Sequence, residues 1–407
     1  MNTAVSRRLL PGRGLALLGL LVVAANLRTA VAALSPIVAE VNADIPLGAI
    51  SLGVLGMLPP VCFAFFGIFT PMITRRHGLE VPLVLALVAI LIGHVTRGLS
   101  GSLTMLILGS VIAFAGLGVG NVLLPPLVKK YFPDRVGLVT SLYVTVLSLS
   151  TLIPALIAVP VADASSWRVS LGMWMLLALF ALVPWVTLLV RHRTASLSGP
   201  VVEEADAAIL GRLWTSSIAW AIAGVFAASS LNAYAMFAWL PQLLVDTAGV
   251  SPAQAGTLLA LYASMGIPCA LIIPVLTARL TNVGPLVYVG VFAFVAGDLG
   301  LFLVPETLTW LWVSLAGLGP LFFPFALVLI NLRTRTHAGA VALSSFVQSV
   351  GYTLGALGPL IVGLLHELSG GWRWPLGFLM VSALAIIIAG AVIGRPHVLE
   401  DDVARSR

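Results

Sequence analysis

Twelve long apolar runs, separated by short polar breaks, dominate this chain of 407 residues. A membrane-spanning helix needs about 20 mostly apolar residues. Strands of a membrane barrel would instead alternate over segments of roughly ten residues. The runs therefore predict an all-α membrane protein with twelve transmembrane helices. We expect spans at about 14–38, 49–73, 81–99, 103–127, 137–161, 169–190, 216–241, 254–278, 285–304, 308–331, 339–365 and 374–394.

The composition supports a lipid bilayer as the surroundings of the chain. Hydrophobic residues make up 60% of it and charged residues only 9%, whereas soluble domains carry about 25% charged residues. The net charge is +6, but the basic residues lie between apolar runs, so we expect no nucleic acid partner. The first run continues to about Val38, which is too long for a cleaved secretory signal.

The lysines and arginines predict the orientation. Seventeen of the 21 lie in one set of loops, three lie in the opposite set, and Arg28 lies inside a span. Basic loops remain on the cytoplasmic side of a membrane. We therefore expect a multi-pass protein of the cytoplasmic (inner) membrane with both termini in the cytoplasm.

The two halves of the chain repeat one another. Trp167-Arg168-x-x-Leu171-Gly172 returns 205 residues later as Trp372-Arg373-x-x-Leu376-Gly377, and the same offset relates Pro36 to Pro241 and Pro154 to Pro359. The longest polar segment lies between spans six and seven. The pattern predicts two pseudo-symmetric bundles of six helices, 1–190 and 216–407, joined by a cytoplasmic linker at 191–215.

Several segments resemble one family. They are Ala25-Asn26-Leu27-Arg28, Gly120-Asn121 with Pro125, the segment from Gly137 to Tyr143, Trp239-Leu240-Pro241, and Gln348 to Tyr352 with Gly358-Pro359. From about 20 to 395 the sequence resembles the cyanate-permease branch of the major facilitator superfamily, which also includes nitroimidazole transporters. The resemblance implies the major facilitator fold and alternating-access transport of a small solute, either an anion or a small polar organic molecule. Many facilitators carry an Asp between spans two and three, where this chain has Arg75.

Arg28 is the main candidate for substrate binding. It lies near the middle of the first span, where a charge costs about 2.5–3.5 kcal/mol on insertion scales. Asp298 is the one acidic residue well inside a span, and in the implied architecture its helix is peripheral. An unpaired guanidinium predicts an anionic or strongly polar substrate. The alternative is a structural arginine that is bonded to backbone carbonyls of a neighbouring helix.

Other polar and aromatic residues are further candidates for the binding site, since the resemblance places several of their helices at a central cavity. They are Asn26, Asn121, Tyr143, Asn232, Tyr234, Trp239, Tyr262, Gln348 and Tyr352. Gln348 and Tyr352 are four residues apart and share a helix face. Asn26 lies about 200° around the helix from Arg28 and shares its face only if the helix unwinds. Packing or anchoring roles are the alternative for each.

His94 and Asp298 occupy matching positions in the two halves. Ionisable residues inside a membrane are often proton relays, so both are candidates for proton coupling, with a structural polar contact as the alternative. Arg97, Arg168 and Arg373 lie at the outer ends of spans. We expect their side chains to extend toward the lipid headgroups.

The sequence offers no catalytic constellation, metal-ligand spacing or phosphate-binding loop, so we expect neither an enzyme nor a cofactor. The favoured function is secondary transport, by symport or uniport, of a small anionic or polar organic solute by a monomer. Two alternatives remain: a multidrug or nitroimidazole-type exporter of neutral molecules, and a membrane sensor that does not transport.

Overall fold

The computed structural model describes residues 12–132, 134–192, 213–280, 282–335, 337–394 and 399. All regular elements within these ranges are helical, and twelve helical segments are long and apolar enough to cross a membrane. This confirms the expected fold class. The proposed linker, 191–215, falls mostly on 193–212, which lies outside the described residues.

The first half of the chain supplies six spans. The first span is interrupted and consists of α1 (Arg13–Asn26), α2 (Thr29–Ala32), the 3-10 helix η1 (Ser35–Ile37) and α3 (Val38–Asp44). The others are α4 (Ala49–His77), α5 (Glu80–Gly98), α6 (Leu103–Tyr131), α7 (Val136–Ala164), and α8 (Trp167–Gly172) with α9 (Met175–His192).

The second half supplies the other six spans. They are α11 (Ser217–Ala248), α12 (Pro252–Ser264) with α13 (Gly266–Arg279), and α14 (Gly284–Leu303). These are followed by α15 (Thr309–Leu318), η2 (Gly319–Leu321) and α16 (Phe322–Leu332), by α17 (His337–Gly355) with α18 (Leu357–Ser369), and by α19 (Arg373–Ile393).

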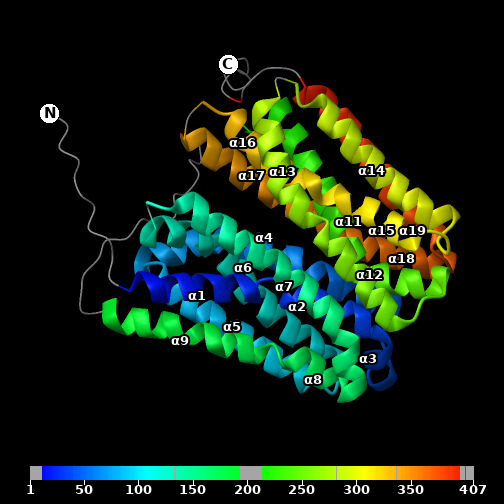
Figure 1. Cartoon of the computed structure of the whole chain (residues 1–407), viewed down its shortest axis with the longest axis horizontal. Helices are drawn as coiled ribbons and strands as arrows, with labels where there is room; N and C mark the ends of the chain where they lie inside the picture. Colours follow the sequence, from blue (N-terminus) through cyan, green and yellow to red (C-terminus); the bar gives the residue numbers. More distant parts are fainter. Residues whose placement is uncertain are drawn as a thin grey trace.

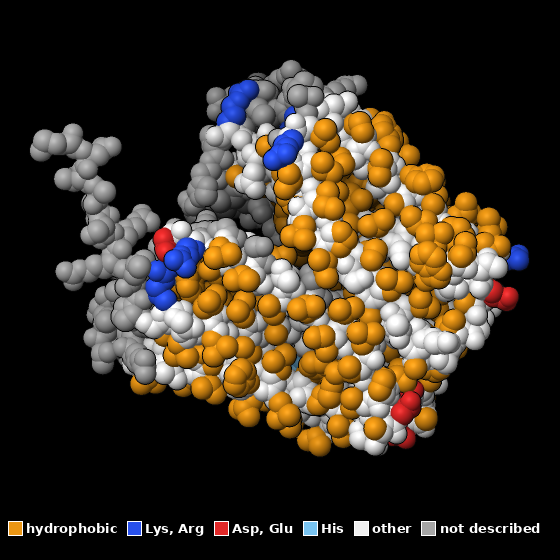
Figure 2. Space-filling view, viewed as in Figure 1, with side chains coloured by type: hydrophobic (Ala, Val, Ile, Leu, Met, Phe, Trp, Pro, Cys, Tyr) orange, Lys and Arg blue, Asp and Glu red, His pale blue; other side chains and the backbone are white. Residues whose placement is uncertain are grey.

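The helices define two sides of the molecule. The linker side carries the start of α1 and the ends of α9 and α19, and the far side carries the ends of α3, α7 and α18. In Figure 1 the first half lies below the second, and the two diverge toward the left, the side on which α1 begins. Figure 2 shows a hollow between the halves in that direction.

The outer surface of the helices is apolar, as a bilayer requires. Hydrophobic side chains cover most of the face seen in Figure 2, and large ones such as Phe292 and Ile388 are more than 70% exposed. Ion pairs that the structure describes lie near helix ends, such as Lys130–Glu80 on the linker side and Arg168–Asp44 on the far side. Water is available there to solvate the charges.

The two halves touch mainly toward the far side. Gly56 in α4 packs against Pro359 and Ala238, and Gly256 in α12 lies against the Ala155 carbonyl. A Cβ atom at Gly56 would come within 2.8 Å of Pro359, so a larger residue would push the halves apart. Buried apolar residues of both halves form one cluster at this contact. The halves are therefore closed on the far side and separated on the linker side.

Candidate functional site

Arg28 lies at a break in the first span. α1 ends at Asn26 and α2 begins at Thr29, and Arg28 between them has φ −124° and ψ −7°. Backbone groups freed by such a break must be satisfied inside the protein. Thr29 donates from its hydroxyl to the Asn26 carbonyl at 2.9 Å, and Arg97 donates to the Ala30 carbonyl at 3.2 Å. The break is thus held by side-chain hydrogen bonds.

Aromatic side chains from both halves surround Arg28. Its guanidinium carbon lies 5.5 Å from the centre of the Phe63 ring in α4. The guanidinium also faces the hydroxyls of Tyr234 in α11 and Tyr352 in α17, within range of electrostatic and hydrogen-bond interactions with both. The structure therefore brings Arg28 together with two other predicted site residues, each more than 200 positions away from it in the sequence.

The aromatic rings contact one another edge to face around the guanidinium. The Tyr352 ring lies 6.3 Å from Phe63, 6.5 Å from Tyr234 and 5.1 Å from Phe226, measured between centroids. Such pairs stabilise one another beyond the area they bury. They form a rigid apolar wall with two phenol groups directed toward one cation. Sequence reasoning did not single out Phe63 or Phe226, because an isolated Phe in an apolar run carries no signal.

Arg28 has no acidic partner among the residues that the structure describes. The side chain is half-buried. A guanidinium has five N–H donors in a planar fork, and a fork of this kind matches the two oxygens of a carboxylate or a small oxyanion. Two neutral phenols and a ring face leave the net positive charge in place, so the site can accept a negative or strongly polar group.

Three other predicted residues are half-buried near this centre. Gly120 in α6 packs against Leu27 at the break, and the next residue, Asn121, donates to the Leu117 carbonyl of its own helix at 3.1 Å. Tyr143 packs against the same apolar cluster as Tyr234. Gln348 lies one helical turn before Tyr352, and its side chain donates to the Ser344 hydroxyl at 2.8 Å.

The remaining predicted residues make packing contacts away from Arg28. Asn26 donates to the Leu177 carbonyl in α9 at 3.3 Å, so it bonds a neighbouring helix. Asn232 donates to the Ser382 hydroxyl at 2.7 Å, and Trp239 donates to the Pro359 carbonyl at 2.9 Å. Tyr262 lies beside Asp298. All four are buried.

The two candidates for proton coupling are fully buried in peripheral helices. In α5, His94 contacts the Leu171 carbonyl through Nδ1 at 3.2 Å. In α14, both carboxylate oxygens of Asp298 lack a hydrogen-bond partner within the described ranges, and so does the nearby hydroxyl of Tyr262 in α12. Asp298 therefore adjoins a helix at the interface of the halves, whereas His94 contacts a helix of its own half.

The expectation for Arg97 was wrong. Its side chain is fully buried and bonds Ala30 instead of extending to the headgroups. The guanidinium carbon lies 5.9 Å from the centre of the Phe114 ring. Two of its nitrogens, Nε and Nη2, have no hydrogen-bond partner in the described part of the chain. Arg168, by contrast, is partly exposed and bonds Asp44 at 2.6 Å.

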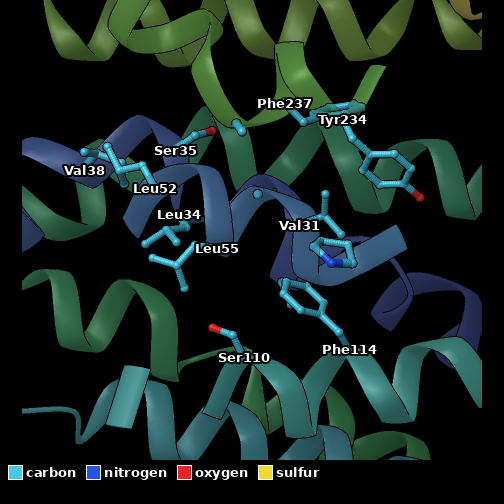
Figure 3. A pocket seen from close by; sticks show the side chains of 14 residues that line it. Val31, Leu34, Ser35, Val38, Leu52, Leu55, Ser110, Phe114, Tyr234 and Phe237 are labelled. Carbon is cyan, nitrogen blue, oxygen red and sulfur yellow. The ribbon is translucent and has the colours of Figure 1, made fainter. Parts of the chain in front are cut away.

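A small pocket lies next to Tyr234, toward the far side (Figure 3). Residues of both halves form its walls, from α2 and η1, α4, α6 and α11. It leaves about 30 Å³ for the centres of water molecules, which is room for roughly two waters. In Figure 3 the Tyr234 ring borders the pocket and its hydroxyl points away from it.

Comparisons with known proteins agree with this architecture. Residues 16–356 match the family model described as the Major Facilitator Superfamily. The chain is 31% identical to the 2-nitroimidazole transporter of Escherichia coli over 384 residues, which cover 93% of this chain and 94% of the relative. It is 25% identical to the cyanate transport protein of the same organism over 381 residues, with coverage of 91% and 95%. These matches confirm the resemblance inferred from the sequence.

A solved structure has the same fold. It is that of a bacterial homolog of the human lysosomal transporter Spinster in an inward-facing, unoccupied conformation. The TM-score is 0.72 at 15% identity, with 94% of this chain and 96% of the other covered. At this identity the likeness concerns the fold alone.

Proposed function

This chain belongs to the Major Facilitator Superfamily, and from that premise we propose that it is a secondary active transporter of a small anionic or strongly polar organic solute. The observation that carries the proposal is the environment of Arg28. A cation with no acidic partner among the described residues lies at a helix break and faces Tyr234 and Tyr352 of the second half. Transporters of this architecture bind substrate near the bilayer midplane between their repeats.

In this proposal Arg28 is the electrostatic anchor of the solute. The phenol groups of Tyr234 and Tyr352 orient the bound molecule, and Asn121, Tyr143 and Gln348 complete the lining of the cavity. Neutral hydrogen-bonding groups add specificity at modest affinity. A transported molecule must leave as well as bind, so one charged contact with neutral neighbours suits a carrier.

The transport cycle follows from the arrangement of the halves. We place the linker side in the cytoplasm and the protein in the inner membrane, because 17 of its 21 basic residues are predicted on that side. The hollow then opens to the cytoplasm, with the far side closed. Rocking of the halves about the central site would expose Arg28 to the outside.

An exporter of neutral nitroaromatic molecules is the second candidate. The edge-to-face rings of Phe63, Tyr234 and Tyr352 suit a flat aromatic solute, and a nitro group presents two oxygens to a guanidinium as a carboxylate does. The relative that is 31% identical is a 2-nitroimidazole transporter. Cyanate, benzoate, 2-nitroimidazole and a lipophilic cation therefore form the decisive substrate panel.

The test is counterflow in proteoliposomes without ATP, with an unlabelled member of the panel inside and the same molecule, radiolabelled, outside. We expect saturable flux of an anion or a nitroaromatic molecule. We expect Arg28→Gln to abolish binding and flux while the protein remains monodisperse in detergent. Arg28→Lys keeps the charge but loses the planar fork, so it should weaken binding by roughly tenfold.

Three outcomes would contradict the proposal. Wild-type flux in Arg28→Gln would make Arg28 a structural residue. Saturable binding of a panel member with no flux in either direction would identify a sensor instead of a carrier. Flux of the lipophilic cation alone would favour a multidrug exporter.

A further inference from the structure

We propose that the small pocket between Tyr234 and the far side is a second, outer binding subsite for the transported solute, and that it takes a small anion or a compact polar molecule. The inference rests on the proposed function, since the pocket would be a second binding subsite on the same transport path. Its support comes from different residues: Ser35, Ser110 and Arg97.

Two buried hydroxyls face this pocket without partners. Ser110 in α6 is fully buried and Ser35 in η1 is 7% exposed. Neither hydroxyl has a hydrogen-bond partner in the ranges that the structure covers. Figure 3 shows the two residues on opposite sides of the pocket, with the Ser110 hydroxyl pointing into it. A buried hydroxyl without a partner costs free energy, so these groups are suited to a polar occupant.

The buried guanidinium of Arg97 lies behind one wall of the pocket. It bonds the carbonyl of Ala30 and lies against the ring of Phe114, and both residues line the pocket. Gly109, which precedes Ser110, approaches the Arg97 backbone so closely that a Cβ atom would lie 3.0 Å from its nitrogen.

No described acidic side chain pairs with Arg97. A charge in surroundings of low dielectric constant acts strongly over short distances. The Arg97 cation behind the wall therefore favours an anion over a cation in the pocket.

The pocket also lies on the path that the solute must take. Tyr234 separates it from Arg28, because its ring lines the pocket while its hydroxyl faces the guanidinium. The lining includes Leu52 and Leu55 of the first half and Phe237 of the second. When the halves separate on the far side, this lining opens to the outer solution. A solute that enters from outside meets Ser110 before it meets Arg28.

The volume fits a compact molecule. The present space holds about two waters, which is comparable with a triatomic anion such as cyanate. A larger solute would enter only after the far side opens. The pocket thus acts as an outer binding subsite for small solutes. While the far side is closed, it is too narrow to admit larger ones.

The test compares the two directions of transport. Ser110→Ala removes the hydroxyl, and Ser110→Thr keeps it. Initial rates would be measured in right-side-out and inside-out proteoliposomes with labelled cyanate, nitrate, formate and 2-nitroimidazole. We expect Ser110→Ala to raise KM for entry from the far side by about tenfold, with KM from the linker side unchanged. Ser110→Thr should restore the far-side KM to within about threefold.

Matched controls separate the subsite from general damage. Ser150 in α7 is also buried, but its hydroxyl donates to the Leu147 carbonyl at 2.7 Å. Ser150→Ala should leave both KM values unchanged. Arg97→Lys should keep the far-side KM near the wild-type value, whereas Arg97→Met should raise it when the protein is monodisperse.

The outcomes distinguish the subsite from the transport proposal. If the wild type transports a solute, and Ser110→Ala has the same KM as the wild type from each side, the subsite proposal is wrong. The transport proposal would be unaffected. Absence of wild-type flux for every solute would overturn the proposed function, and the subsite with it.

Discussion

Arg28 places one guanidinium cation, with five N–H donors, at the break in the first span. Its neighbours are the phenols of Tyr234 and Tyr352 and the ring face of Phe63. Each phenol can either donate to a solute or accept from Arg28. The site therefore offers neutral, adjustable contacts around one fixed charge.

Removal of the phenol hydroxyls tests this arrangement. Tyr234→Phe and Tyr352→Phe keep the aromatic wall and lose one hydroxyl each, so we expect each to weaken solute binding by about three- to tenfold. Isothermal titration calorimetry of the purified protein measures the effect. Tyr288→Phe is the control, because Tyr288 is exposed on α14. Wild-type affinity in both variants would place the phenols outside the site.

A second prediction concerns Asp298. Its buried carboxylate has no hydrogen-bond partner among the described residues, and it adjoins Tyr262 in α12, which packs against α7 of the other half. We expect Asp298→Asn to keep the fold and to abolish the stimulation of flux by an imposed pH gradient. We expect His94→Gln to keep that stimulation. The measurement is uptake with and without the gradient, and a full response in Asp298→Asn would exclude this residue as the coupling site.

The sequence singled out three residues that the structure brings together, and it did so for a physical reason. Arg28, Tyr234 and Tyr352 stand out because polar groups are costly in apolar runs. Arg97 carries the same signal, but its position near a helix end made an interfacial role equally consistent. Arg97 is buried because its guanidinium donates to the Ala30 carbonyl at the break in the first span. That partner lies 67 residues away, and no local pattern reports it.

At the scale of helices, close packing depends on glycine at equivalent positions of the two halves. Gly93 in α5 packs against the backbone of Ala113 in α6, and Gly297 in α14 packs against that of Ala316 in α15. Small residues allow such approach between membrane helices. A Cβ atom at either glycine would collide with the backbone of the neighbouring helix.

Alanine at these glycines should therefore destabilise the protein. We expect Gly93→Ala and Gly297→Ala each to cost about 1–3 kcal/mol through overpacking, seen as a lower melting temperature in detergent. The control is Gly224→Ala in α11, where no atom lies within 4 Å of the added carbon. Alanine favours helix formation there, so melting at or above the wild-type temperature is expected. Unchanged melting of the first two variants would contradict the packing described.

Element boundaries were largely predictable, and element interruptions were not. Twelve spans follow from hydropathy alone, because a bilayer sets the length of an apolar run. α11 was expected to end near Pro241 but continues to Ala248. The break near Arg28 is bonded by Arg97 of another helix, and the breaks near Met265 and Ala356 lie inside predicted spans. Hydropathy along one chain does not contain that information.

At the scale of the whole molecule, the contact between the halves on the far side sets the conformational balance. Gly56→Val would introduce side-chain atoms where an added Cβ atom alone would come within 2.7 Å of Ala238. We expect this wedge to shift the population toward states that are open on the far side. Gly48→Ala is the control, since no atom lies within 4 Å of the added carbon there.

Accessibility of a single cysteine measures this shift. Ser110→Cys places a thiol in the outer pocket, and the native Cys62 and Cys269 are buried. An impermeant maleimide added from the far side should label it several-fold faster when Gly56→Val is also present. Equal labelling rates with and without the wedge would show that the contact at Gly56 does not control opening.

The apolar cluster shared by the two halves has a thermal consequence. It joins Leu52 and Leu55 of α4 to Leu240 and Leu244 of α11, with Ala155 and Leu259 nearby. Opening on the far side brings part of this surface into contact with water, and exposure of apolar surface raises the heat capacity. The activation enthalpy for turnover should therefore depend on temperature, so that an Arrhenius plot of the transport rate curves. Cooling would weaken the attraction that keeps the far side shut.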